Sequence, residues 1–365
     1  MTTDEAYHLL DKLLRKGSLD EIAAVAREFP GILFRRWERG RTSLHLACEN
    51  RGASSLDILR FLIEQGVAVD ARDDHGARPL HVAACGSGGI ATIPLLLEKG
   101  ADVNATDHRG VTALHCATYL TPDYAAALLR HGARADATDA RGDTPILWAL
   151  QEGTEGVARF LWNHGARHDI FAASGLGFAD VVRRLLDTNP DLARAKDHKG
   201  RTALHWAARR EQIETAQLLI ERGALVDQGD DKGRSPLHEA AVQCMTKDMI
   251  SLLLTHGADP DATDHHGSTP LHIAARRGQP DLVGRLMAGG ADTTRMNAQG
   301  LTPLKALMKT LDEDLSLAEY VFKNYRRIRA QLEDRGEVVY ILLTNANRMA
   351  PPGDFSPGEP GESHS

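Results

Sequence analysis

An eight-residue phrase recurs along this chain at a nearly constant interval. It reads GRTSLHLA in one copy and GRTALHWA in another, and neighbouring copies are 36, 34, 32, 58, 33, 34 and 33 residues apart. The copies begin at Gly40, Gly76, Gly110, Gly142, Gly200, Gly233, Gly267 and Gly300. A short fixed period predicts a row of similar small repeats that stack on one another, because one repeat alone cannot bury its apolar face.

The phrase itself predicts the start of a helix. In the copy STPLHIA, Thr269 precedes a proline, which is the order typical of a helix N-cap and the first helical position. Leu271, Ala274 and Ala275 follow at spacings that give one apolar stripe, and the small alanines allow a neighbouring helix to approach closely. A second helix is expected from Asp281 to Met287.

A second phrase lies between the copies of the first, as in LLLTHGADPDATDHHG from Leu252 to Gly267. Its leucines continue a helical stripe, and the glycine that follows them suits the left-handed turn that ends a helix. Its last four residues, Asp264 to Gly267, have the Asp-x-x-Gly pattern of a tight turn. This phrase therefore predicts a projecting tip loop between the helices of successive repeats.

Both phrases resemble the ankyrin repeat, over residues 40 to about 310. The resemblance implies a mainly α-helical solenoid of about ten repeats, each with a β-hairpin and two antiparallel helices. It also implies that the periodic histidine bonds the turn of its own or an adjacent repeat. A catalytic base is not expected six times at one periodic position. The residues expected to act structurally are Thr42, His45, His81, Thr112, His115, Thr202, His205, His238, Thr269 and His272.

A larger symmetry divides the chain into two similar halves. Residues 16–47 match residues 176–207 without a gap, at an offset of 160 residues, and each segment leads into four copies of the phrase. We therefore expect two tandem arrays, each led by a degenerate repeat. The expected segments are an N-terminal capping helix pair (1–39), a first array of four repeats (40–168), an internal leader (169–199), a second array of four repeats (200–310), a C-terminal capping region (311–349) and a disordered tail (350–365).

The junction between the two arrays leaves two alternatives open. The segment GARHDIFAASG runs from the end of one repeat into a helix without a tip phrase, which favours a kink or a subdomain boundary from Ala166 to Ser174. The other alternative is an uninterrupted superhelix of ten repeats.

Composition and motifs argue against several function classes. The formal net charge of −7 supplies no basic field for nucleic acid or an anionic membrane. The N-terminus lacks the apolar stretch of a signal peptide or membrane span, so a cytoplasmic protein is expected. Cys48, Cys85, Cys116 and Cys244 fit no zinc or disulfide spacing and are expected to be reduced core residues. No phosphate-binding loop, zinc-protease or nucleophile-elbow motif is present, so no catalytic, metal or cofactor site is expected.

Binding to another protein is the function that these observations favour. We expect a non-catalytic, monomeric scaffold or adaptor that uses the concave surface of its tip loops and first helices. Aromatic and arginine side chains often contribute most of the interface energy. The candidate contact residues are Arg109, Arg141, Lys199, Lys232 and His266 at the tips, and Trp148, Trp206, Arg209, Arg210, Glu239, Arg276 and Arg277 on the first helices. The alternative function is a regulatory or inhibitory subunit of a co-encoded enzyme, or an effector delivered into a foreign cell.

Overall fold

The computed structural model describes residues 2–310, apart from residues 17, 51–54, 87–88 and 244–247. Within these residues the protein has nineteen α-helices, and β-structure is limited to two isolated bridges, Thr106 with Thr112 and Lys196 with Thr202. The expected C-terminal capping region (311–349), the expected disordered tail (350–365) and Cys244 lie outside the described residues.

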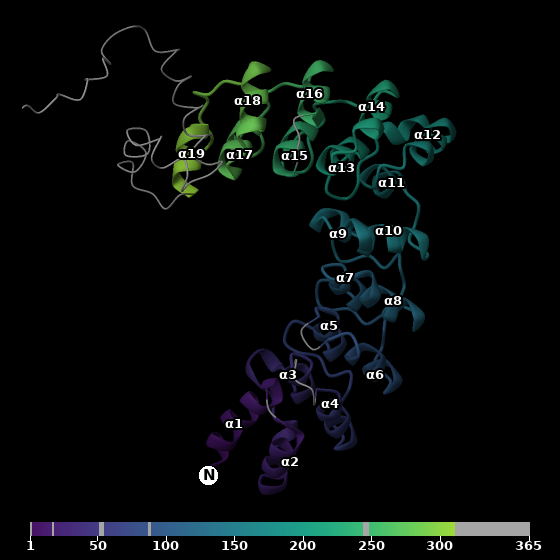
Figure 1. Cartoon of the computed structure of the whole chain (residues 1–365), viewed down its shortest axis with the longest axis vertical. Helices are drawn as coiled ribbons and strands as arrows, with labels where there is room; N and C mark the ends of the chain where they lie inside the picture. The colour runs from purple at the N-terminus through teal and green to yellow at the C-terminus, as the bar shows by residue number, and fades with distance from the viewer. Residues whose placement is uncertain (1, 17, 51–54, 87–88, 244–247, 311–365) are drawn as a thin grey trace, which may run out of the picture. The chain divides into compact units, whose positions relative to one another are not determined.

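Most repeats consist of a short first helix and a second helix that packs against it (Figure 1). The first helices are α3 (Ser43–Ala47), α5 (Pro79–Ala84), α7 (Ala113–Ala117), α9 (Pro145–Glu152), α13 (Ala203–Arg209), α15 (Pro236–Gln243), α17 (Pro270–Arg277) and α19 (Pro303–Thr310). The second helices are α4 (Ser55–Glu64), α6 (Thr92–Glu98), α8 (Pro122–Arg130), α10 (Glu155–Asn163), α14 (Ile213–Glu221), α16 (Asp248–Thr255) and α18 (Pro280–Ala288). The remaining elements are α1 (Thr3–Lys16), α2 (Leu19–Glu28), α11 (Ile170–Leu176), α12 (Ala179–Thr188) and the 3₁₀ helices η1 (Ile32–Phe34), η2 (Glu38–Gly40) and η3 (Pro190–Ala193).

The chain divides into two compact units, an N-terminal unit, Met1–Phe178, and a C-terminal unit that begins at Ala179. In the N-terminal unit the first helices α3, α5, α7 and α9 stack in one row, and α4, α6, α8 and α10 form a second row. The C-terminal unit repeats this arrangement with α13, α15, α17 and α19 in one row and α12, α14, α16 and α18 in the other. The division separates α11 from α12, so the expected internal leader (169–199) contributes to both units. A kink at residues 166–174 remains a prediction.

The first helices begin where the threonine phrase predicts. Thr269 has an extended backbone and precedes α17, and the proline that follows it occupies the first turn. Leu271, Ala274 and Ala275 are fully buried, as the apolar stripe requires. Full burial of one leucine side chain contributes about 2 kcal/mol, so one such stripe in every repeat supplies the continuous core of each row.

Most tip loops are closed by an aspartate that binds its own turn. In one tip, Oδ1 of Asp107 accepts hydrogen bonds from the backbone N–H groups of Arg109 at 2.8 Å and Val111 at 2.9 Å. Gly110 in the same turn has a φ of +74°, and a Cβ there would lie 2.6 Å from the backbone nitrogen of Ala140 in the next tip. Glycine is therefore required at this position both for the backbone conformation and for the close approach of the next tip.

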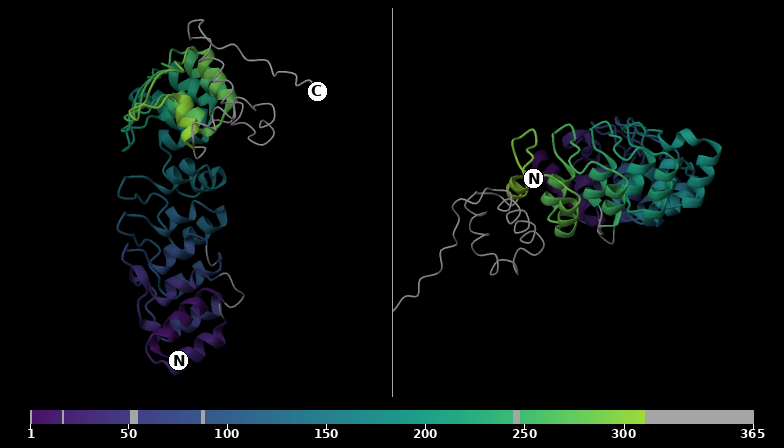
Figure 2. Two further views of the ribbon diagram at one scale, coloured as in Figure 1. Left: turned by 90° about the vertical axis from the view of Figure 1, so that its left-hand side faces the viewer. Right: turned by 90° about the horizontal axis from the view of Figure 1, so that it is seen from above.

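Main-chain hydrogen bonds also join neighbouring tips. The Ala140 N–H donates to the carbonyl oxygen of Arg109 at 2.7 Å, and the His265 N–H donates to that of Lys232 at 2.8 Å. Figure 2 shows the tips projecting from one side of the helices. Each unit therefore carries a continuous row of tips beside its row of first helices.

Candidate protein-binding surface

The periodic histidines link each first helix to the following tip. In all six copies Nδ1 accepts a backbone N–H from the residue three positions earlier, at 3.0–3.2 Å. Because Nδ1 is an acceptor, Nε2 carries the ring proton and donates to a carbonyl oxygen of the next repeat. These second bonds are 2.8–3.1 Å long and pair His45 with Ala77, His81 with Val111, His115 with Asp143, His205 with Arg234, His238 with Ser268 and His272 with Leu301.

The six histidine rings are buried, and burial lowers the pKa of each of them below the ordinary value of 6.5. A neutral ring suits both hydrogen bonds, because protonation would remove the lone pair of Nδ1. The threonines expected to be structural, Thr42, Thr112, Thr202 and Thr269, are the N-cap residues in front of four of these histidines. All of these groups are occupied within the protein and offer nothing to a partner.

The candidate contact residues differ widely in exposure. Six of them have exposed side chains, at the tips and at the end of α17: Arg109, Arg141, Lys232, His266, Arg276 and Arg277. Four are half-buried, namely Trp148, Lys199, Arg209 and Arg210. Trp206 and Glu239 are buried, so direct contact between these two side chains and a partner was a wrong expectation.

Trp206 is only 1% exposed because the tip in front of its helix closes over it. Its indole Nε1 donates to Oδ2 of Asp197 at 3.2 Å, and the Arg201 guanidinium lies 4.1 Å from the ring centroid. Trp148 occupies the same position of its repeat and donates to Asp139 in the same way, at 3.3 Å. An indole at this position therefore fastens a first helix to its own tip.

Glu239 is 1% exposed because two arginines neutralise it inside the row of first helices. Its Oε2 lies 2.7 Å from Nη1 of Arg209 in the preceding repeat, and its Oε1 lies 3.0 Å from Nη1 of Arg234. Burial raises the pKa of the Glu239 carboxyl, but the charges of Arg209 and Arg234 outweigh this effect and hold the pKa below the ordinary value. Arg209, a candidate contact residue, therefore has a structural partner.

A groove of about 650 Å³ in the C-terminal unit brings three of the exposed candidates together. His266 lies on one tip, while Arg276 and Arg277 end helix α17, and all three line the groove. Val242 and Ile273 add apolar side chains to its lining. The remaining candidates do not line this groove.

The groove carries an excess of positive charge. Oδ1 of Asp264 in its lining accepts the backbone N–H groups of His266 at 2.9 Å and Ser268 at 2.8 Å. Lining residue Arg234 is held by Asp230 and Glu239. Among the described residues, Arg276 and Arg277 have no ion-pair partner, so their charges are available to a ligand.

Three of the four cysteines lie among the described residues. Cys48, Cys85 and Cys116 are free, and Cys48 is buried, which raises the pKa of its thiol. Cys85 is exposed because it follows the last turn of α5, so a core position was wrong for this residue. The described part of the chain contains no cluster of metal-binding side chains. None of its helices combines the length and the apolar character that a membrane span needs.

One pocket was missed by sequence reasoning altogether. It lies in the N-terminal unit and is lined by Tyr7, Trp37 and Arg39, among others. The signal was present in the sequence, because the offset of 160 residues aligns Trp37 with the tip aspartate Asp197. The first tip, residues 37–41, therefore differs from the others, because it has a tryptophan in place of that aspartate.

Comparison with known proteins agrees with this architecture. The family profile described as ankyrin repeats (3 copies) matches residues 7–107, 84–172, 170–264 and 241–331. Human neurogenic locus notch homolog protein 2 is 32% identical over 205 residues, which are 53% of this chain and 7% of that protein. Mouse neurogenic locus notch homolog protein 1 is 32% identical over 193 residues, which are 46% of this chain and 8% of that protein. The matches thus cover less than a tenth of these relatives. With matches to the family profile from residue 7 to residue 331, the chain belongs to the ankyrin-repeat family.

Proposed function

We propose that this protein is a non-catalytic adaptor that binds an acidic segment of a partner protein in the groove of its C-terminal unit. One observation carries the proposal: Arg276 and Arg277 are exposed in a groove with apolar lining and have no acidic partner among the described residues. Complementary charge steers association and selects a partner, while the apolar lining supplies contact area.

The family supports binding to another protein as the role of such a surface. We further propose that each repeat presents a β-hairpin tip to a concave face, and that two arrays with degenerate leaders form the chain. A monomeric, cytoplasmic protein that binds neither nucleic acid nor a membrane is part of the same proposal. Lys232, an exposed candidate of the same unit outside the groove, is proposed to extend the contact surface. Arg109 and Arg141 are proposed to contact a partner from the N-terminal unit.

Affinity capture with charge-reversal variants tests the proposal. The full-length protein and the Arg276→Glu/Arg277→Glu variant are used to capture partners from native lysate, after their thermal unfolding curves have been compared. Arg295→Glu is the matched control, because Arg295 is exposed in the same unit but does not line the groove. We expect a partner that the wild type and the control retain and the double variant loses.

Mapping of the captured partner completes the test. Crosslinking from the groove should reach a segment rich in aspartate and glutamate, and binding should weaken as salt concentration rises. Equal retention by all three proteins, or a crosslinked segment without acidic residues, would contradict the proposal. A regulatory subunit or a delivered effector would use the same surface, so the identity of the captured partner separates these alternatives from an adaptor.

A further inference from the structure

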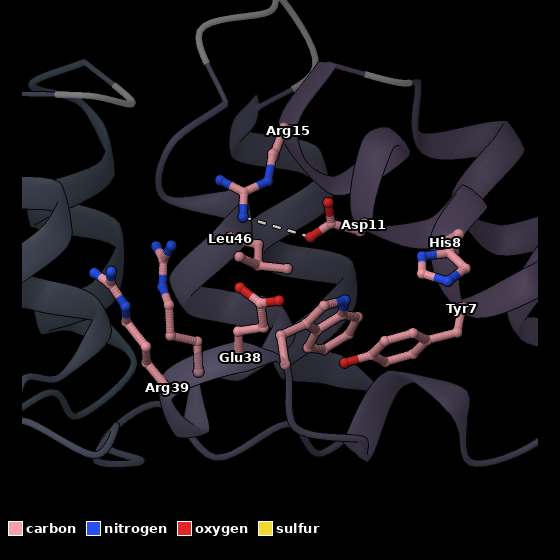
Figure 3. A pocket seen from close by; sticks show the side chains of 9 residues that line it. Tyr7, His8, Asp11, Arg15, Glu38, Arg39 and Leu46 are labelled. Carbon is pink, nitrogen blue, oxygen red and sulfur yellow. Dashed lines mark hydrogen bonds and ion pairs between the residues drawn. The ribbon is translucent and has the colours of Figure 1, made fainter. Parts of the chain in front are cut away.

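The N-terminal unit contains a second cavity, of about 350 Å³, between helix α1, the first tip and helix α3 (Figure 3). We call it the α1 pocket. Tyr7, His8, Asp11 and Arg15 reach it from α1, and Leu46 reaches it from α3. The rest of its lining is Trp37, Glu38, Arg39 and Arg41 of the first tip.

Seven of the eight described tips are closed by a side-chain oxygen. In each of them, Oδ1 of an aspartate or asparagine accepts the backbone N–H groups two and four residues later, at 2.8–3.1 Å. The residues with this role are Asp73, Asp107, Asp139, Asp197, Asp230, Asp264 and Asn297. The first tip has Trp37 at this position, so it lacks the acceptor.

Three N–H donors of the first tip consequently have no acceptor among the described residues. Two are the backbone N–H groups of Arg39 and Arg41, which the missing carboxylate would have bound. The third is the indole Nε1 of Trp37, which is buried and unpaired although Trp148 and Trp206 both donate to a tip aspartate. Of the three, the indole Nε1 is buried, and a buried donor without an acceptor costs about 1–3 kcal/mol, so an acceptor supplied from outside would be favourable.

The charges around the pocket leave one cation available. Arg15 and Arg41 both pair with Glu49, and Arg15 also lies 3.4 Å from Asp11. Arg39 is exposed and has no ion pair within the part of the chain that the structure describes. Glu38 is exposed beside it. Arg39 is therefore the one arginine of the pocket lining without a carboxylate partner in the described part of the chain, and it lies on the tip that has no aspartate of its own.

Two stacked aromatic rings, of Tyr7 and Trp37, form one side of the pocket next to the N–H donors of the first tip. The rings of Tyr7 and Trp37 stack with centroids 5.1 Å apart, and the Tyr7 hydroxyl donates to the carbonyl oxygen of Arg36 at 2.8 Å. These two contacts fix the pair of rings between α1 and the first tip. A ligand that suits this pocket has a group that only accepts hydrogen bonds, for the unpaired N–H donors, and an adjoining apolar part that contacts the rings of Tyr7 and Trp37.

We propose that the α1 pocket binds a carboxylate of a partner peptide, which replaces the missing tip aspartate. The carboxylate accepts from the tip N–H groups and pairs with Arg39, while the adjoining carbons contact Tyr7 and Trp37. This site is in the N-terminal unit and does not depend on the groove proposed above. An acidic side chain and a C-terminal α-carboxylate share this chemistry, and the experiment distinguishes them.

The test is a titration of the full-length, ¹⁵N-labelled protein followed in the indole N–H region of its NMR spectrum. N-acetyl-aspartyl-methylamide carries a side-chain carboxylate, N-acetyl-alanine carries only a terminal one, and N-acetyl-asparaginyl-methylamide is the neutral control. The Trp37 signal is identified by its loss in Trp37→Phe. We expect one of the acids to shift this signal saturably and the neutral amide to leave it in place.

Two variants make the test specific to the tip. Arg39→Asn removes the cation and fits the backbone, because Arg39 has a φ of +60° that asparagine tolerates; it should weaken binding at least fivefold. Trp37→Asp restores the residue of the other tips and should abolish binding, which is followed by calorimetric titration because this variant lacks the Trp37 signal. The proposal is overturned if neither acid shifts the Trp37 signal, if the amide shifts it equally, or if Arg39→Asn binds as well as the wild type.

Discussion

The stability of the repeat array should fall steeply as the pH drops below about 6.5, the ordinary pKa of histidine. Burial lowers the pKa of His45, His81, His115, His205, His238 and His272 in the folded protein, so the unfolded chain binds more protons than the native state. Histidine stabilisation is therefore fully present above pH 6.5 and is lost as the pH falls towards the folded pKa values.

The magnitude follows from the number of rings. One histidine that takes up a proton only on unfolding contributes about 1.4 kcal/mol per pH unit, so all six together contribute a limiting slope of about 8 kcal/mol per pH unit. Total stabilities of about 5–15 kcal/mol are typical, so a slope of this order would lower the stability of the array substantially in mildly acid solution. Carboxylates with a lowered pKa, such as Glu239 and Asp230, lose their contribution only at lower pH.

Urea unfolding at pH 7.5, 6.5 and 5.5 and constant ionic strength measures this slope. His205→Leu should remove about one sixth of the limiting slope, because one of six rings is lost. The matched variant is His265→Gln, for which the wild-type slope is expected, since that ring is exposed and has no hydrogen bond to another repeat among the described residues. An uptake of fewer than two protons on unfolding below pH 6.5 would refute the assignment of neutral, bridging rings.

Four substitutions test the packing. Glu239→Gln should lower the free energy of unfolding by about 3 kcal/mol or more, as measured in urea, because Arg209 loses its buried partner; an unchanged midpoint would refute this. Trp206→Ala should cost about 3–5 kcal/mol by the same assay, and a near-neutral result would mean that its ring is not buried. Gly110→Ala should lower the melting temperature, because alanine at a φ of +74° is strained by at least about 1 kcal/mol; an unchanged melting temperature would refute this. Thr269→Ala should cost about 1 kcal/mol through loss of an N-cap, and an unchanged melting curve would count against that role.

Local rules made the helix starts predictable. Thr269 and the proline after it specify an N-cap and a first turn by their own backbone and hydrogen-bonding preferences, and α17 begins there. The same holds for the tip turn that starts at Asp107, whose carboxylate binds N–H groups two and four residues away. These contacts lie within five residues, so the sequence pattern contains all the groups that make them.

The burial of a first-helix side chain by its tip loop could not be predicted in this way. The position of Trp206 varies among repeats, being Leu46, Val82 and Cys116 in three of them, and variability suggested a surface. Its burial depends on Asp197, which lies nine residues earlier and reaches across from the tip. Periodicity identifies the face of a helix, but it does not show how far a loop covers that face.

A repeat chain offers a comparison that most proteins lack, because each copy is a control for the others. Where the tips keep their aspartate, as with Asp197, its carboxylate accepts the backbone N–H groups two and four residues later. Trp37 departs from this rule, and the cost of the departure is three donors without an acceptor in the described structure. Folding alone gives no reason for that cost, since Asp197 closes the corresponding turn of its own tip. The departure is explained if the acceptor belongs to a partner, and this is why the α1 pocket is the place to look for one.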